Sequence, residues 1–171
     1  MSALAASRGD FADAGDGAVS GVLYVVSRLP FVVRRRVRWS DCDPAGVVYT
    51  GRFSEFVLDA VQLFFSDIAG GSYHRWVAGL GVDTPCKGME FTFHHALWPE
   101  DTFDMTCTVP AIREHGYDIA IEAAGMTGTP IFSARFSPIC IQREVRRRVP
   151  IPPAMRTAIE RHRVASGAGA T

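Results

Sequence analysis

Two aspartates two residues apart, Asp41 and Asp43, have the clearest chemical potential in this sequence. Asp43 is followed by Pro44 and soon by Gly46, which break regular structure and bend the backbone. An amphipathic pattern begins at Phe53, so the bend comes shortly before a helix. A carboxylate at such a bend can lie near the first free N–H groups of the helix. A nucleophile or base beside preorganised donors is suited to acyl transfer.

Other chemistries fit the acidic turn poorly. A calcium loop of the EF-hand type needs an oxygen ligand at its fifth position and a glutamate at its twelfth, where this sequence has Ala45 and Arg52. A phosphatase-type pair of aspartates needs a larger α/β domain with further acidic motifs. Cys42 is a candidate nucleophile with a histidine as base, but a small buried thiol is the simpler interpretation. An Asx-turn, in which the Asp43 side chain only shapes the bend, stays open beside catalysis.

The segments around the turn predict a helix wrapped by a sheet. Alternating β-branched and charged residues predict a strand over 31–39. Apolar residues at three- and four-residue steps predict a long helix from Phe53 to Ile68, followed by a shorter one. Its broad aromatic face requires a large partner such as a curved sheet. The other strands and a terminal helix at about 154–164 are predicted by alternation and turn residues: 89–94, 103–109, 117–124 and 131–141.

Length and composition indicate an ordinary globular protein. A chain of 171 residues predicts one domain, and zero formal net charge gives no indication of nucleic acid or a membrane as partner. No apolar run reaches the ~18 residues of a membrane helix. The four cysteines are widely spaced without a zinc motif, so we expect a reduced cytoplasmic protein. We interpret 1–28 and 166–171 as flexible tails around a single domain at 29–165.

The acidic turn also carries a family resemblance. Residues 41–49, Asp-Cys-Asp-Pro-Ala-Gly-Val-Val-Tyr, closely resemble the signature of the 4-hydroxybenzoyl-CoA thioesterase family. Asp83-Thr84-Pro85 resembles the Gly-Thr-Pro segment that follows the helices in that family, and the turn at 99–101 matches a family turn between middle strands. The resemblance covers roughly residues 31–152. It implies an α+β hotdog fold, in which a five-stranded antiparallel sheet wraps a long central helix.

The resemblance implies roles for individual residues. Asp43 corresponds to the carboxylate that attacks the thioester carbonyl or activates water, and the Thr50 backbone N–H corresponds to the donor that polarises the carbonyl oxygen. Asp41 is expected to point away and cap the turn. Glu55 is a reserve carboxylate, because some thioesterases of the superfamily use one from the helix. The expected substrate-binding residues include two arginines for the phosphates of coenzyme A: Gly46, Tyr49, Thr84, Pro85, Arg113 and Arg146.

The sequence therefore predicts an acyl-CoA thioesterase, a hydrolase that releases free acid and CoA from aromatic or short to medium acyl-CoA. The resemblance implies no cofactor, no metal and a homodimer or homotetramer whose sites are shared between protomers. Thr50 stands where benzoyl-CoA enzymes have tyrosine and a related envelope-linked branch has histidine. Two alternatives stay open. One is an acyl-carrier-protein thioesterase with a basic docking surface, and the other is a non-catalytic hotdog protein that binds acyl-CoA.

Overall fold

The computed structural model describes residues 21–166, which form a six-stranded antiparallel sheet, three helices and a small second sheet. The strands of the main sheet are β1 (Leu23–Arg28), β2 (Phe31–Arg36), β4 (Cys86–Phe93), β5 (Thr102–Ile112), β6 (Tyr117–Gly125) and β7 (Pro130–Pro138). The short strands β3 (Val82–Asp83) and β8 (Ile141–Gln142) pair with each other. The helices are α1 (Arg52–Ala69), α2 (Tyr73–Gly79) and α3 (Pro153–Ser166), and a 3-10 turn spans Trp39–Asp41.

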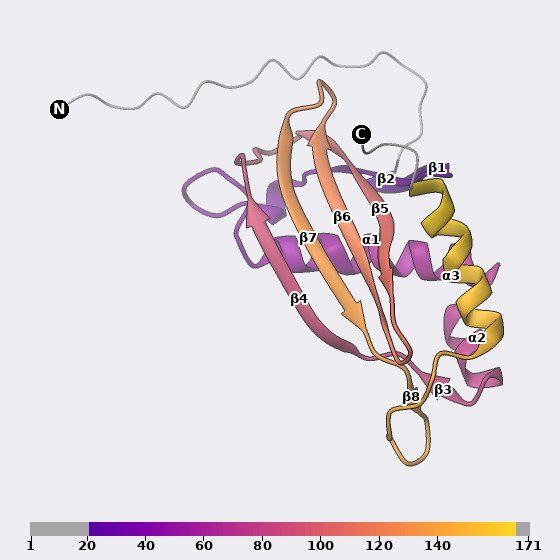
Figure 1. Cartoon of the computed structure of the whole chain (residues 1–171). Helices are drawn as coiled ribbons and strands as arrows, with labels where there is room; N and C mark the ends of the chain where they lie inside the picture. Colours follow the sequence, from indigo (N-terminus) through magenta and orange to yellow (C-terminus); the bar gives the residue numbers. More distant parts are fainter. Residues whose placement is uncertain (1–20, 167–171) are drawn as a thin grey trace.

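The main sheet has one N-terminal edge strand and one edge strand that follows the helices. Its strands run β1-β2-β5-β6-β7-β4, so β1 and β4 are the edge strands. The chain leaves the sheet after β2, forms α1 across one face, and returns as β4 beside β7 (Figure 1). This long central helix on an antiparallel sheet confirms the predicted hotdog architecture.

Helix α1 forms because its apolar residues recur on one face and bury against the sheet. The buried residues of the helix all lie on this stripe: Phe53, Phe56, Val57, Ala60, Val61, Phe64 and Ile68. Aromatic contacts join helix to sheet, with the ring centroids of Phe56 and Phe103 5.8 Å apart. The helix ends at Gly70, whose φ of +65° is the left-handed conformation that favours glycine.

The predicted five-strand sheet and the expected tail at 1–28 are both corrected at the N-terminal side. β1 is a sixth strand inside that range, and it pairs with β2 from Leu23 opposite Arg35 to Arg28 opposite Phe31. Its apolar residues escaped recognition because an edge strand is only half-buried and shows no clean alternation. The predicted tails at 1–20 and 167–171 lie outside the described residues.

No membrane-spanning helix is predicted from the sequence, and the helices of the structure can be compared with that prediction. Among residues 21–166, none of the helices has the length and apolar character needed to cross a bilayer.

The α1 core gives a first test. Phe64 is fully buried and its ring meets Phe31 at 5.4 Å between centroids, whereas Leu58 on the same helix is 46% exposed. We expect Phe64→Ala to lower the free energy of unfolding by about 3–5 kcal/mol, because it loses apolar burial and leaves a cavity. Leu58→Ala should change it by about 0.5 kcal/mol or less. Urea unfolding of both variants measures this, and equal losses would contradict the assigned helix face.

Candidate functional site

The signature loop, residues 41–51, folds into a tight turn between β2 and α1. The Asp43 N–H donates to Val47 O at 2.9 Å, and the Gly46 N–H donates back to Asp43 O at 2.9 Å. Gly46 has φ +81°, a left-handed conformation that explains the glycine at this position. Cys42 and Val48 pair across the base of the turn. The loop is therefore closed by its own backbone before the helix begins.

One of the two carboxylate oxygens of Asp43 is engaged in a hydrogen bond within this turn. Its Oδ1 accepts a hydrogen bond from the Ala45 N–H at 2.8 Å, which is the Asx-turn that stayed open on sequence grounds. Within residues 21–166 nothing donates to the other oxygen, Oδ2, and the residue is only half-buried. The turn thus orients the carboxylate and leaves one oxygen for a ligand.

Thr50 presents an open backbone donor at the start of α1. Its neighbours are engaged, since the Tyr49 N–H donates to Asp41 O at 3.0 Å and the Arg52 N–H donates to Tyr49 O at 2.8 Å. The Thr50 N–H has no acceptor in the described part of the chain, and the residue is exposed. An unpartnered N–H just before a helix is a ready site for a negatively charged or polarised oxygen.

Asp41 turns away from solvent, as expected, and caps the 3-10 turn. It is 1% exposed, and its Oδ2 accepts the Arg38 N–H at 2.9 Å. Guanidinium nitrogens of three arginines lie within 4 Å of its carboxylate: Arg38 at 3.3 Å, Arg52 at 3.8 Å and Arg35 at 3.9 Å. These arginines were missed at the sequence level, although Arg35 occupies the same inward phase of β2 as Phe31 and Val33.

The Cys42 thiol is a poor candidate nucleophile. Burial raises its pKa, and the negative charges of Asp41 and Asp43 raise it further. A raised pKa keeps the sulfur protonated near neutral pH, and only the thiolate attacks carbonyl carbon efficiently. Asp43 therefore stays the better candidate.

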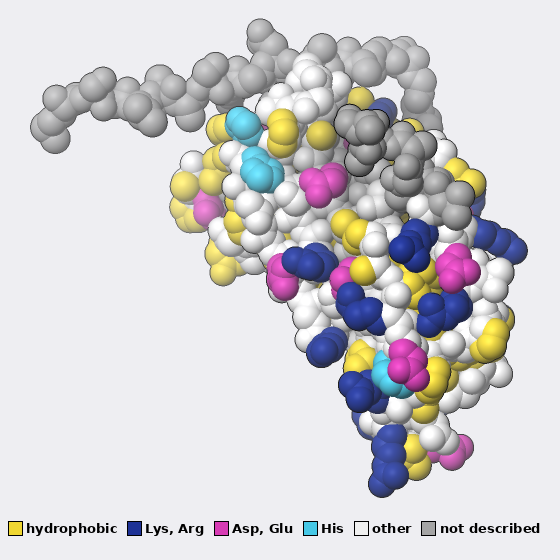
Figure 2. Space-filling model, in the orientation of Figure 1, with side chains coloured by type: hydrophobic (Ala, Val, Ile, Leu, Met, Phe, Trp, Pro, Cys, Tyr) yellow, Lys and Arg dark blue, Asp and Glu magenta, His cyan; other side chains and the backbone are white. Residues whose placement is uncertain are grey.

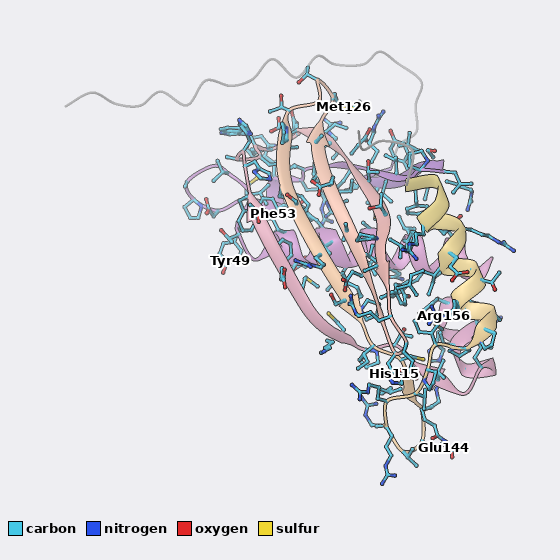
Figure 3. The ribbon with its side chains drawn as sticks, in the orientation of Figure 1. Tyr49, Phe53, His115, Met126, Glu144 and Arg156 are labelled. Atoms are coloured by element: carbon cyan, nitrogen blue, oxygen red, sulfur yellow. The ribbon has the colours of Figure 1, made fainter. Side chains whose placement is uncertain are left out.

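Tyr49 and Phe53 place the signature loop beside the end of β4. The exposed Tyr49 ring lies over Gly51, where a Cβ would stand 2.5 Å from its Cε1 atom, so a larger residue at position 51 would require the ring to move. The Phe53 ring contacts the ring of Phe93, the last residue of β4, with centroids 4.9 Å apart. Figure 3 shows Tyr49 and Phe53 together at this end of the sheet, with His115 at the opposite end.

Three other predicted site residues, Glu55, Thr84 and Pro85, occupy different surroundings. The reserve carboxylate Glu55 is 54% exposed on α1 and is already paired with the Arg52 guanidinium. Thr84 and Pro85 precede β4, at the end of that strand away from Phe93. The Thr84 hydroxyl is hydrogen-bonded to the Tyr73 hydroxyl at 2.7 Å. Within one chain Thr84 and Pro85 therefore lie at the other end of β4 from the signature loop.

A second feature, the basic pocket, lies near the start of β4. It measures about 210 Å³ and is lined by Lys87, Arg113, Glu114, His115, Gly116, Ser137, Pro138, Ile139 and Arg148. Lys and Arg side chains gather over this lower half of the molecule (Figure 2). The predicted Arg113 thus belongs to a cationic pocket. The predicted Arg146 does not line the pocket, and Arg148 lines it instead. Arg146 lies in the loop after β8, with a φ of +52°.

Arg113 is held in the basic pocket by Asp118. Its two terminal nitrogens donate to the two carboxylate oxygens at 2.9 and 2.5 Å, and the Ser137 hydroxyl donates to the same carboxylate at 2.7 Å. The hydrogen bond from Arg113 lowers the pKa of Asp118, with a smaller contribution from Ser137. Lys87 and Arg148, the other two cations of the pocket, have no carboxylate partner among residues 21–166.

Comparison with known proteins agrees with this fold. A model of the thioesterase-like superfamily matches residues 37–159, and the chain belongs to that superfamily. No curated protein matches the chain.

Solved structures resemble the chain over nearly their whole length. A thioesterase-superfamily structure from Jannaschia sp. CCS1 is 26% identical, with a TM-score of 0.71 over 78% of this chain and 93% of that chain. A 1,4-dihydroxy-2-naphthoyl-CoA thioesterase from Synechocystis is 23% identical, with a TM-score of 0.68 over 75% and 94%. The Staphylococcus aureus protein SAV2348, solved in complex with CoA, is 13% identical, with a TM-score of 0.71 over 82% and 93%.

The Asp118 pair predicts a pH dependence of stability. Since the folded protein holds the Asp118 pKa below the ordinary value of 3.8, the folded state binds fewer protons than the unfolded state near that pH. The stabilisation is complete above the unfolded pKa and is lost as pH falls through the folded pKa. We expect the difference in unfolding free energy between wild type and Asp118→Asn to shrink between pH 6 and pH 3. Urea titrations measure it, and a constant difference would contradict the assigned pairing.

Proposed function

We propose that this chain is an acyl-CoA thioesterase that hydrolyses an acyl-CoA to free acid and CoA. One observation carries the proposal. The signature loop presents the Asp43 carboxylate, with one oxygen unengaged, and the unpartnered N–H of Thr50 on the same short segment. A thioester carbonyl needs both a nucleophile or base at carbon and a donor at oxygen.

The chemistry follows from these two groups. As the carbonyl carbon is attacked, negative charge develops on its oxygen, and the Thr50 N–H stabilises that charge by about 3 kcal/mol, as in other acyl-transfer sites. In one route Asp43 Oδ2 attacks, a mixed anhydride forms, the C–S bond breaks and CoA leaves as the thiolate, which takes up a proton. Water then cleaves the anhydride. In the other route Asp43 takes a proton from water as the water attacks the carbonyl carbon. The tetrahedral intermediate then collapses, the C–S bond breaks, and CoA leaves as the thiolate, which takes up the proton from Asp43.

A second copy of this chain is the proposed partner of the β4 edge. β4 is an eight-residue edge strand, and Phe93 at its end is 48% exposed beside the signature loop. An exposed edge with an apolar residue invites strand pairing. Antiparallel pairing of two β4 strands would bring the start of one, with its basic pocket, beside the end of the other. The site would then be shared between protomers.

The basic pocket supports a ligand with phosphates. Lys87, Arg113 and Arg148 line it, and guanidinium groups bind phosphate oxygens through two parallel hydrogen bonds. In coenzyme A a long pantetheine arm separates the thioester from the phosphates. A catalytic loop and a cationic pocket at separate places are therefore what an acyl-CoA requires.

Substitution of Asp43 tests the proposed chemistry. Asp43→Asn keeps an Oδ1 that accepts the Ala45 N–H, so the turn should persist, but the amide is neither base nor nucleophile. We expect kcat for the best acyl-CoA to fall at least a hundredfold, measured as thiol release from a panel of aromatic and aliphatic esters. Asp104→Asn, which only loses its pairing with Arg34 on β2, is the matched control and should retain activity.

The outcomes separate the alternatives. Full activity in Asp43→Asn with a hundredfold loss in Glu55→Gln would assign the carboxylate to the reserve candidate. If wild type failed on every CoA ester but hydrolysed carrier-bound esters, the carrier-protein thioesterase would replace our proposal. Failure on both, with acyl-CoA still bound, would identify a non-catalytic binder.

The basic pocket gives a separate prediction. The double variant Lys87→Glu, Arg148→Glu should raise KM for acyl-CoA at least tenfold and change kcat little, because the phosphates lie away from the reacting carbonyl. The double variant Arg146→Glu, Arg147→Glu, which reverses the same number of charges at exposed residues outside the pocket, is the control. Steady-state kinetics at two salt concentrations measures the effect. An equal rise in KM for both variants would show a general charge effect instead.

A further inference from the structure

Arg35 is a buried arginine in the strand that leads to the signature loop. Along β2 the inward positions are Phe31, Val33 and Arg35, and Arg35 is only 3% exposed. An arginine is almost never buried to this degree unless it is paired. The groups that Arg35 contacts therefore indicate the role of this buried charge.

The Arg35 guanidinium joins three elements. Its Nη1 donates to Asp59 Oδ2 on α1 at 2.7 Å, and its Nη2 lies 3.9 Å from Asp41 Oδ2 in the 3-10 turn. The guanidinium carbon stands 3.9 Å from the centre of the Phe56 ring, also on α1, in a cation–π contact. One side chain thus ties the end of β2 to the signature loop and to the helix.

Among the arginines around Asp41, Arg35 is the buried one. The Asp41 side chain is 0% exposed, whereas the side chains of Arg38 and Arg52 are 50% and 31% exposed and that of Arg35 is 4% exposed. Solvent screens the two exposed cations more strongly, so the charge of Arg35 acts on Asp41 most fully. Its removal would leave a buried carboxylate with weaker compensation.

The position of Asp41 controls both reactive groups of the proposed site. Its carbonyl oxygen accepts the N–H of Tyr49, the residue before Thr50, and Asp43 is two residues further along the chain. A shift of Asp41 would therefore move the Asp43 carboxylate and the Thr50 N–H relative to each other. Small displacements of reacting groups cost large factors in rate.

We propose that Arg35 is a positioning residue for thioester hydrolysis, which holds Asp41 against α1 and so sets the geometry between Asp43 and the Thr50 N–H. The proposal rests on the proposed function. Arg35 is buried behind the signature loop and touches no reacting atom. Its Nε is buried and has no hydrogen-bond partner within residues 21–166, so the side chain is placed to serve two carboxylates rather than to satisfy all its own donors.

Kinetics provides the first test. Arg35→Met should lower kcat at least thirtyfold and change KM less than threefold, because the ligand-binding surface is untouched. Arg35→Lys keeps the charge but cannot reach both carboxylates with a planar fork, so its kcat should be intermediate. Arg34→Met is the matched control. It removes the neighbouring arginine of the same strand, whose partner is Asp104, and should retain wild-type kcat.

A thiol-labelling experiment tests the same role without hydrolysis. Cys86 is exposed, Cys107 and Cys140 are buried, and Cys42 is half-buried in the signature loop. In a Cys86→Ser background, labelling by a thiol reagent therefore reports chiefly on Cys42. Arg35→Met should accelerate the reaction at least fivefold below its unfolding transition, whereas Arg34→Met should leave it unchanged.

The two readouts together decide the proposal. Wild-type kcat in Arg35→Met, or unchanged labelling of Cys42, would overturn it. If wild type hydrolysed no thioester, the proposed function would fail, and labelling alone would still show whether Arg35 orders the loop. If Arg35→Met did not fold, Asp59→Ala would serve, since it removes the acceptor of the 2.7 Å contact at a side chain that is 44% exposed. The same two readouts, with smaller changes in the same direction, would support the proposal.

Discussion

The buried carboxylate of Asp41 is the constraint on which the proposed site depends. A charge so deeply buried is stable only with close compensation, and here cations come from β2, from the residue before the 3-10 turn and from the first residue of α1. The same residue closes the signature loop through its backbone, by accepting the Tyr49 N–H. The ion pairs that compensate the Asp41 charge therefore also fix the loop that carries Asp43 and Thr50 just before the helix.

The rest of the fold positions this loop at an edge. The aromatic stripe of α1 fixes the helix across the sheet, and Phe53 meets Phe93 where β4 ends. The basic pocket lies at the start of the same strand, away from the loop. For a single chain this separates the carbonyl chemistry from the phosphate-binding groups, and antiparallel pairing of two β4 strands would bring one of each together. In that proposed arrangement, substrate binding would require dimerisation.

Much of this fold was predictable from local patterns. The α1 stripe from Phe53 to Ile68 and the period-two strands are strong signals, and the acidic turn at 41–49 located the candidate site. β1 was missed because a half-buried edge strand lacks clean alternation. Two features depend on contacts between distant segments, which spacing alone does not encode. They are the burial of Arg35 and the presence of Arg148, rather than Arg146, in the lining of the basic pocket. The inward phase of Arg35 in β2 was the one local indication of its burial.

The most direct test of the account is the hydrogen exchange of the Thr50 amide, measured by NMR with and without a non-hydrolysable thioether or amide analogue of an acyl-CoA. The free N–H is exposed and unpartnered, so it should exchange rapidly. If it binds the substrate carbonyl, a saturating analogue that carries that carbonyl should slow its exchange at least tenfold, whereas CoA alone should not. Saturable binding of the analogue with unchanged exchange at Thr50 would contradict the proposed site.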